Sequence, residues 1–280
     1  MIAQITPLVL TFNEAPNIER VLRKLSWAQR IVVVDSGSND GTLEIISRFP
    51  QAEVYHRPFD NAAEQCNFGL TLIRTEWVLS LDADYELSHE LVQELLNLTD
   101  IEGVAGYRGS FVYRIYGRSL RGTLYPPRTV LYRARVAHYV NEGHTQRVVV
   151  TGEVRSLRGV IYHDDRKSLP RWFASQERYA RLEADHLLNS EPRFLPFADR
   201  LRRTGWLAPI AVLFYVLIIK RCFFDGWAGW FYTLQRVLAE TMLAVELIDR
   251  RLAYGREPKR ATIRGGGANA DPGPERLSRG

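Results

Sequence analysis

Short apolar runs alternate with amphipathic segments over the first third of the chain. The apolar runs have the length and β-branched composition of strands, and they occupy residues 5–10, 30–35, 52–56 and 77–81. Hydrophobic positions recur at helical spacing in the other segments, residues 17–25, 43–49, 62–73 and 89–98. Strands that alternate with helices predict a mostly parallel sheet with crossover helices.

The pattern changes after Gly103. Short alternating runs of Tyr, Arg, Val and Gly up to Ile161 predict smaller, partly antiparallel strands, and the chain from Leu169 onward reads as helical. Residues 207–219 are almost wholly apolar but fall short of the roughly 20 residues of a spanning helix, which predicts a buried or interfacial helix.

The segment from Gly226 carries large apolar residues at helical spacing, among them Trp227, Trp230 and Leu234. Two interpretations stay open: both late helices pack on the domain or on each other, or they contact a membrane. We therefore predict three parts: an α/β domain at 1–168, a helical region at 169–255 that can attach to a membrane interface, and a disordered basic tail at 256–280.

Composition narrows the class of protein. With 46% hydrophobic residues in 280, the chain can bury a substantial core. Two cysteines and the absence of a segment resembling a signal peptide lead us to expect a cytoplasmic location. The formal charge is +5, and basic residues flank the late apolar run at Arg200, Arg202, Arg203, Lys220 and Arg221. That arrangement suits an anionic membrane surface better than a nucleic acid.

Two acids follow the strand at 77–81 and carry the candidate chemistry. Side chains at i and i+2 of an extended segment point the same way, so Asp82 and Asp84 can face one cation. Magnesium and manganese sites typically use one or two carboxylates, with phosphate and water as the other ligands. An isolated Asp-x-Asp can equally be a pair of solvated acids that opens a loop.

Polar groups also follow two other strands of the predicted sheet. The segment from Thr11 to Glu14 comes after the first strand, and Asp35 ends the second. Ligands of open α/β sheets bind outside the carboxyl ends of the strands, so these groups and the acid pair predict a nucleotide site. On its own, the segment after Asp35 could be an ordinary turn capped by Asp40.

Several motifs resemble those of family-2 glycosyltransferases with the GT-A fold. They are Thr11-Phe-Asn-Glu14, Val33-Val-Asp-Ser-Gly-Ser-Asn-Asp-Gly-Thr42, Gln65-Cys-Asn-Phe-Gly69 and Leu79-Ser-Leu-Asp-Ala-Asp84. Three further segments are similar to bacterial lipopolysaccharide-core β-1,4-glucosyltransferases: Tyr125-Pro-Pro-Arg-Thr-Val-Leu-Tyr132, Glu142-Gly-His144 and His163-Asp-Asp-Arg166. The resemblance is specific up to about residue 185 and implies a mixed, mostly parallel, Rossmann-like sheet.

The resemblance implies a UDP-sugar donor and a divalent cation, Mg²⁺ or Mn²⁺. The residues expected around the donor are Thr11, Glu14, Asp35, Asn67, Asp82 and Arg128. Asp82 and Asp84 are expected to hold the ion, with His163 near it. Many family members carry Arg where this chain has Cys66, so we expect Arg128 or another basic residue to meet the phosphates.

Inverting transfer requires a carboxylate that takes the proton of the acceptor hydroxyl. Glu142 is our candidate, with Asp164 and Asp165 as alternatives. Arg114, Arg118, Arg121 and Arg128 are either a site for an anionic acceptor or a solvated basic face.

The resemblance implies transfer of a hexose, most often glucose, to a lipid-linked lipopolysaccharide inner-core sugar at the cytoplasmic face of the inner membrane. Two other functions remain as alternatives. A phosphohydrolase of the haloacid-dehalogenase kind would use Asp82 as nucleophile, and a non-catalytic relic would bind glycan or membrane without turnover.

Overall fold

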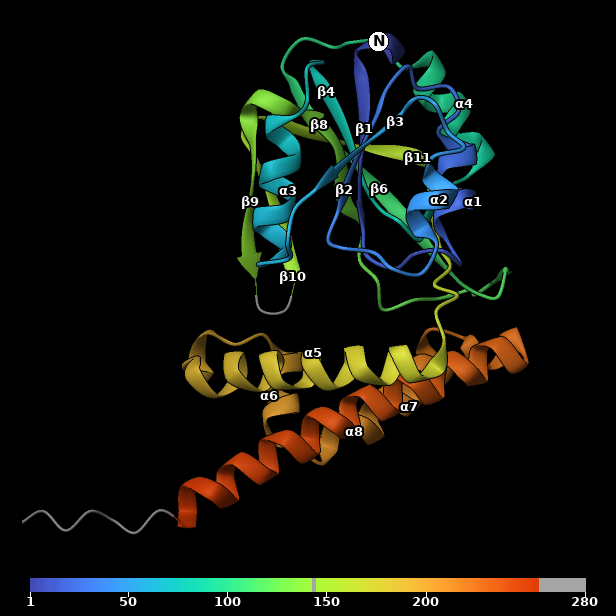
Figure 1. Cartoon of the computed structure of the whole chain (residues 1–280). Coiled ribbons are helices and arrows are strands. Elements are labelled where there is room, and N and C mark those ends of the chain that lie inside the picture. The colour runs from blue at the N-terminus through green and yellow to red at the C-terminus, as the bar shows by residue number, and fades with distance from the viewer. Residues whose placement is uncertain (143–144, 257–280) are drawn as a thin grey trace, which may run out of the picture.

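The computed structural model describes residues 1–142 and 145–256, and the predicted tail after residue 256 lies outside this range. A curved sheet with flanking helices forms the upper part of the molecule in Figure 1, and a layer of helices from the second half of the chain lies below it. The two parts are joined by the segment between β11 (Glu153–His163) and α5 (Leu169–Asn189).

The first half of the chain forms a parallel sheet, as predicted. Its strands, in spatial order, are β3 (Ala52–His56), β2 (Ile31–Asp35), β1 (Ile5–Thr11) and β4 (Trp77–Asp82). All of β2 is buried, which explains its unbroken apolar run because helices cover both faces of the sheet.

Four helices connect or follow these strands. They are α1 (Ile18–Lys24), α2 (Thr42–Ile46), α3 (Ala62–Thr71) and α4 (His89–Asn97). The side chains of Asn61 and Ser88 cap α3 and α4 by accepting the amides of Glu64 and Leu91. The helix α2 ends before its predicted end at residue 49, because the chain tightens into i to i−3 hydrogen bonds from Arg48 to Ile45 and from Phe49 to Ile46.

The second half of the domain adds strands of mixed direction. They are β5 (Tyr85–Leu87), β6 (Val104–Ile115), β7 (Arg118–Ser119), β8 (Arg128–Arg133) and β11. Antiparallel β8 lies between β4 and β6, so β6 and its parallel partner β11 run in the direction of β4. A separate hairpin, β9 (Ala137–Glu142) and β10 (Thr145–Val150), packs against α3. Over the described residues the sheet is therefore mixed and mostly parallel, as predicted.

Two apolar clusters on opposite faces hold the sheet together. One contains Leu22, Trp77 and Leu91 and joins α1, α2 and α4 to the sheet. The other contains Leu8, Cys66 and Tyr139 and joins α3 and the hairpin. The register aligns Thr11 with Asp35 and Leu10 with Asp82, so β1, β2 and β4 end at one edge.

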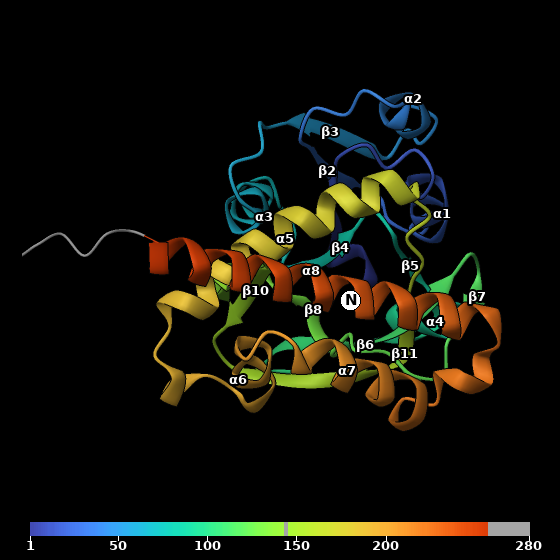
Figure 2. The ribbon, with the colours of Figure 1, turned by 90° about the horizontal axis from the view of Figure 1, so that it is seen from below.

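Helices from the rest of the chain cross below this edge (Figure 2). They are α5, α6 (Phe197–Arg203), α7 (Leu207–Phe214), a π-helical turn (Tyr215–Ile219) and α8 (Trp227–Arg256). Shorter 3-10 turns occur at Ile2–Gln4, Ala134–Val136, Pro192–Phe194 and Cys222–Asp225. Ile115 and Leu120 pack against Val216, Ala228 and Tyr232, so the late helices do pack on the domain.

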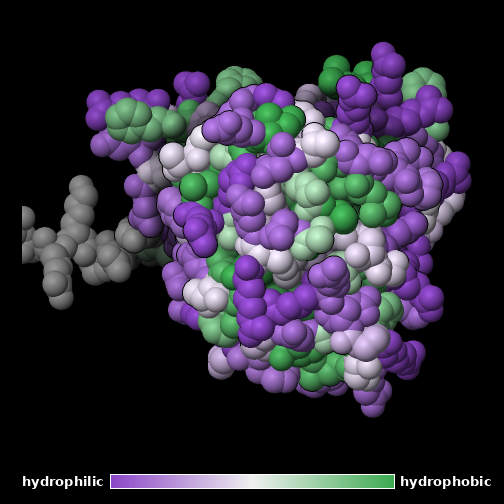
Figure 3. All heavy atoms as spheres, turned by 90° about the horizontal axis from the view of Figure 1, so that it is seen from above, coloured by the Kyte–Doolittle hydropathy of each residue, from purple (hydrophilic) through white to green (hydrophobic). Residues whose placement is uncertain are grey.

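A further apolar surface on the helical layer stays uncovered. Its residues lie between the π-helical turn and the middle of α8, and the largest are Ile218, Ile219, Phe223, Phe224, Trp227, Trp230 and Leu234. In contrast, the opposite end of the molecule shows mostly hydrophilic residues with small scattered apolar groups (Figure 3). No helix in the described ranges combines the length and hydropathy needed to cross a bilayer.

Candidate functional site

Asp82 and Asp84 open into one cavity at the carboxyl edge of the parallel strands. The cavity has a volume of about 850 Å³ and lies between the sheet and the helices α5 and α8. The cavity is also lined by Thr11 at the end of β1, Glu14 after it, Ser36 after β2 and His163 at the end of β11. Side chains from distant parts of the sequence thus converge where the strand order predicted a ligand site.

The two acids differ in their surroundings. Burial and the charge of Asp84 raise the pKa of Asp82. Burial also opposes ionisation of Asp84, but His163 Nε2 at 3.3 Å and Lys167 Nζ at 3.8 Å outweigh it and hold the pKa of Asp84 below its usual range. An added cation would relieve the repulsion between the two carboxylates.

The acid pair fits a divalent cation that takes its other ligands from a substrate. Asp84 Oδ1 is buried and has no hydrogen-bond partner, so it can accept a metal–oxygen bond. Over the described residues, His, Cys, Asp and Glu side chains form no group of three or more arranged as a metal site. The carboxylates alone are thus an incomplete coordination shell, as is usual for magnesium beside phosphate.

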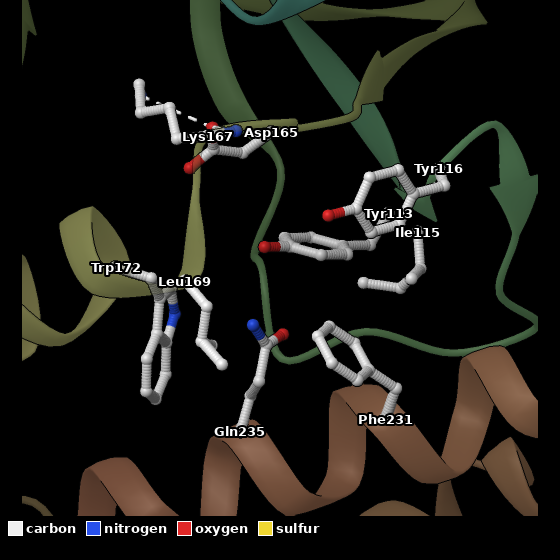
Figure 4. A pocket seen from close by; sticks show the side chains of 9 residues that line it. All are labelled: Tyr113, Ile115, Tyr116, Asp165, Lys167, Leu169, Trp172, Phe231 and Gln235. Carbon is white, nitrogen blue, oxygen red and sulfur yellow. Dashed lines mark hydrogen bonds and ion pairs between the residues drawn. The ribbon is translucent and has the colours of Figure 1, made fainter.

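Lys167 is a site residue that the sequence analysis missed. Its ammonium lies 2.7 Å from Glu14 Oε1 and 3.5 Å from Asp165 Oδ1, and the latter pair is drawn in Figure 4. Burial and then the charge of Asp84 raise the pKa of Glu14 to about 7, with Lys167 acting in the opposite direction. The available signal was its position just after the motif that begins at His163.

Asp35 is buried and does not line the cavity. The carboxylate is buried and accepts the amides of Gly37 and Ser38 at 2.9 and 3.0 Å and the Ser38 hydroxyl at 2.5 Å. It therefore shapes the turn that carries Ser36 into the cavity. A direct contact of Asp35 with a nucleoside stays a prediction. Thr11 does line the cavity, and its buried Oγ1 has no hydrogen-bond partner.

Asn67 was expected around the donor, but Gln65 of the same motif lines the cavity instead. Asn67 does not line the cavity, because its amide group donates to Tyr139 O and accepts from Tyr139 N and so ties α3 to β9. Gln65, two residues earlier in α3, lines the cavity and donates to Ser36 Oγ at 2.9 Å. Its buried Oε1 has no partner and is available to a ligand.

Arg128 lies in the cavity wall with its guanidinium 4.6 Å from the ring centroid of Tyr125. Among the described residues it forms no ion pair with a carboxylate, which leaves its charge available to an anion. Arg114, Arg118 and Arg121 do not line the cavity. Arg114 stacks on Tyr162 and Arg121 pairs with Asp225 at 3.3 Å.

The candidate bases occupy three different settings. Asp164 is fully buried and accepts from Arg20 and Arg166, so it serves the structure. Asp165 lines the cavity beside Lys167. Glu142 ends β9, and its side chain lies outside the described part of the structure. Its neighbour Asn141 pairs with Gln146, which lines the cavity, so the hairpin end reaches the site.

Comparison with known proteins identifies a family and several proteins that are similar to this chain in sequence. The family described as Glycosyl transferase family 2 matches residues 8–207. A Rickettsia bellii protein, named as an uncharacterized glycosyltransferase, is 26% identical over 244 residues, which are 81% of this chain and 80% of that protein. The lipopolysaccharide core biosynthesis glycosyltransferase LpsC of Rhizobium meliloti is 26% identical over 208 residues, 68% of this chain and 74% of LpsC.

The fold is similar to that of a mannosyltransferase from Pyrobaculum calidifontis, solved in complex with GDP-Man and Mn²⁺. The TM-score is 0.50 at 17% sequence identity, and the match covers 91% of this chain and 88% of the other. The predicted GT-A-like fold is thereby confirmed.

Proposed function

This chain belongs to glycosyl transferase family 2 and is a glycosyltransferase, and from that premise we propose that it transfers a hexose from a UDP-sugar with inversion. The observation that carries the proposal is the pair Asp82 and Asp84 in one large cavity, with the unpartnered Oδ1 of Asp84. The donor is a sugar nucleotide whose diphosphate lies beside these acids.

Asp82 and Asp84 would hold a divalent cation, Mg²⁺ or Mn²⁺, and His163, whose Nε2 lies 3.3 Å from Asp84 Oδ2, would stand next to this pair. The bound ion offsets charge on the departing nucleoside diphosphate. Arg128 supplies a second positive charge for the diphosphate, since it lines the cavity and forms no close ion pair among the described residues. Thr11, Glu14 and the turn shaped by Asp35 bind the nucleoside, and Gln65 Oε1 accepts a hydrogen bond from it. Asn67 supports this part of the site by fixing α3 to β9.

Glu142 is the proposed general base. It removes the proton of the acceptor hydroxyl while the oxygen attacks the anomeric carbon from the face opposite the diphosphate, which inverts the configuration. The position of Gln146 in the cavity wall supports this assignment, because the opposing strand β9 ends at Glu142 next to it.

The most favoured donor is UDP-glucose and the most favoured acceptor a lipopolysaccharide inner-core sugar. Similarity to LpsC supports the acceptor class, and the motifs shared with core glucosyltransferases support the hexose. The family match argues against a phosphohydrolase with Asp82 as nucleophile.

Incubation with UDP-glucose, UDP-galactose or other sugar nucleotides, Mn²⁺ and isolated core oligosaccharide tests this proposal. We expect one donor to give a UDP-releasing, acceptor-dependent product whose anomeric configuration, measured by NMR, is opposite to that of the donor. A retained configuration would contradict the inverting mechanism. UDP binding without transfer from any donor would favour the non-catalytic relic.

We also propose that the uncovered apolar surface rests on the cytoplasmic face of the inner membrane. Phe223, Phe224 and Trp227 are each more than half exposed, and Lys220 and Arg221 stand beside them as partners for anionic lipid headgroups. In this proposal the outer face of the helical layer contacts lipid, while its inner face packs on the α/β domain.

Replacing Phe223, Phe224 and Trp227 together by serine is expected to weaken binding to vesicles of phosphatidylcholine and phosphatidylglycerol at least about 10-fold, because three apolar side chains lose their burial in lipid. Co-sedimentation measures the change. Leu96→Ser is the control, since Leu96 is exposed on α4, away from this surface. Equal binding by the triple variant and the control would contradict membrane attachment through this surface.

A further inference from the structure

The cavity continues beyond the acid pair to a floor made by two helices. The floor residues of α5 recur at helical spacing and are Trp172, Ser175, Gln176 and Tyr179. Those of α8 do the same and are Tyr232, Arg236, Ala239 and Leu243. At about 850 Å³ the cavity lies toward the upper end of the roughly 300–1,000 Å³ typical of ligand pockets, which leaves room for a second substrate beside the sugar nucleotide.

Aromatic contacts link this floor to the acid pair. His163 lies 3.3 Å from Asp84, its ring centroid is 4.7 Å from that of Tyr113, and Tyr113 is 5.0 Å from Tyr232 on α8. Arg236 follows Tyr232 by one helical turn and therefore lies on the same face of α8. Arg236 is thus one helical turn beyond this chain of contacts and lines the same cavity as the acid pair.

Arg236 carries a charge that the described protein does not neutralise. Among the described residues it has no ion pair or hydrogen bond, and its buried Nε lacks a partner. Arg202, in contrast, lies 2.7 Å from Glu240, 3.2 Å from Asp199 and 3.6 Å from Glu183. Arg236 therefore offers the cavity a guanidinium with no ion-pair partner among the described residues, an arrangement that binds an anion. Arg178 of α5 also lines the cavity, and its guanidinium lies 5.4 Å from the ring centroid of Tyr179.

A small recess beside the floor adds aromatic and polar groups. Figure 4 shows the rings of Tyr113, Trp172 and Phe231 around it, with the amide of Gln235 directed toward its centre and the carboxylate of Asp165 turned toward Lys167. Its volume of about 30 Å³ is too small for a sugar ring. It shares Tyr113, Asp165 and Trp172 with the main cavity, so it extends the same wall.

We propose that the floor of α5 and α8 is the acceptor subsite and that Arg236 binds an anionic substituent, phosphate or carboxylate, on the acceptor sugar. Aromatic faces suit the apolar surfaces of a sugar ring, and a guanidinium can grip either anion with two parallel hydrogen bonds. The inference rests on the proposed transferase function and names its acceptor class. Of the four arginines first considered for an anionic acceptor, Arg114, Arg118 and Arg121 lie outside the cavity and Arg128 is assigned to the diphosphate, so the inference gives this role to Arg236 on the floor.

The test compares Arg236→Gln with wild-type enzyme on matched acceptors. The acceptors are core oligosaccharide as isolated, after enzymatic removal of phosphate, and after chemical reduction of carboxyl groups. For the variant we expect the KM of the anionic acceptor to rise about 10-fold or more, since a hydrogen bond to a charged group is lost. Donor KM and kcat at saturating acceptor should stay unchanged. The treatment that abolishes the difference between variant and wild type identifies the anion.

Arg181→Gln is the matched control, because Arg181 is exposed on α5, pairs with Glu177 at 2.5 Å and does not line the cavity. Binding of the isolated and treated oligosaccharides by calorimetry gives a second readout that requires no turnover. An equal rise in KM for charged and uncharged acceptors, or no rise at all, would overturn the proposal. If wild-type enzyme transfers no sugar, the transferase proposal fails, while calorimetry still decides whether Arg236 binds the anion.

Discussion

Replacement of Asp84 by asparagine is expected to reduce sugar transfer about 10³-fold or more and to remove the effect of Mn²⁺ on UDP binding. The variant keeps the shape of the side chain but loses the charge that holds the cation near the diphosphate, where charge develops in the transition state. Asp84 also supplies the buried, unpartnered Oδ1 that fits a metal ligand. Steady-state kinetics and calorimetric titration of UDP with and without Mn²⁺ measure both effects.

Glu86→Gln is the matched control for this experiment. Glu86 lies two residues after Asp84 but points to Arg20 and Arg114, at 3.6 and 4.0 Å, and does not line the cavity. We expect it to retain the Mn²⁺ dependence of the wild type. Unchanged turnover and an unchanged Mn²⁺ effect in Asp84→Asn would place the ion elsewhere and remove the basis of the proposed site.

Replacement of Glu142 by glutamine is expected to lower kcat by about 10²- to 10⁴-fold, which is the range that general-base catalysis contributes. Affinity for UDP should hardly change, because Glu142 is proposed to meet the acceptor hydroxyl and not the nucleotide. Rapid-quench measurement of single-turnover transfer at saturating acceptor isolates the chemical step from product release.

Asp165→Asn provides the comparison for Glu142, because Asp165 also carries a carboxylate that lines the cavity. We expect a smaller loss, arising from its contact with Lys167 at 3.5 Å. A larger loss in Asp165→Asn, together with near-normal turnover in Glu142→Gln, would assign the base to Asp165.

The sequence was sufficient to predict the parallel half of the sheet and the position of the acid pair. Hydrophobic runs bounded by turns define strands, and parallel strands bring their carboxyl ends together, so Thr11, Glu14 and Asp82 meet in one cavity. The direction of β8 between β4 and β6 is a long-range pairing that no local pattern encodes.

The identity of the lining side chains was harder to predict. Asp35 and Asn67 belong to motif segments, yet both bond to backbone groups and lie outside the cavity lining, while Ser36 and Gln65 enter it. A motif specifies which turn or helix reaches the site, but the rotation of that element decides which of its residues faces the ligand. Arg236 was unpredictable for a different reason, because its position depends on how α8 packs beneath the sheet.

The helix α8 separates the cavity from the surface proposed to contact lipid. Tyr232, Arg236 and Leu243 of α8 face the cavity, while Trp227, Trp230 and Leu234 lie on its opposite, exposed side. A helix with its side chains is about 10–12 Å across. An enzyme seated on a bilayer through that exposed side would work at a fixed, short height above the headgroups. It would modify the sugars nearest the lipid and pass over those at the outer end of a long chain.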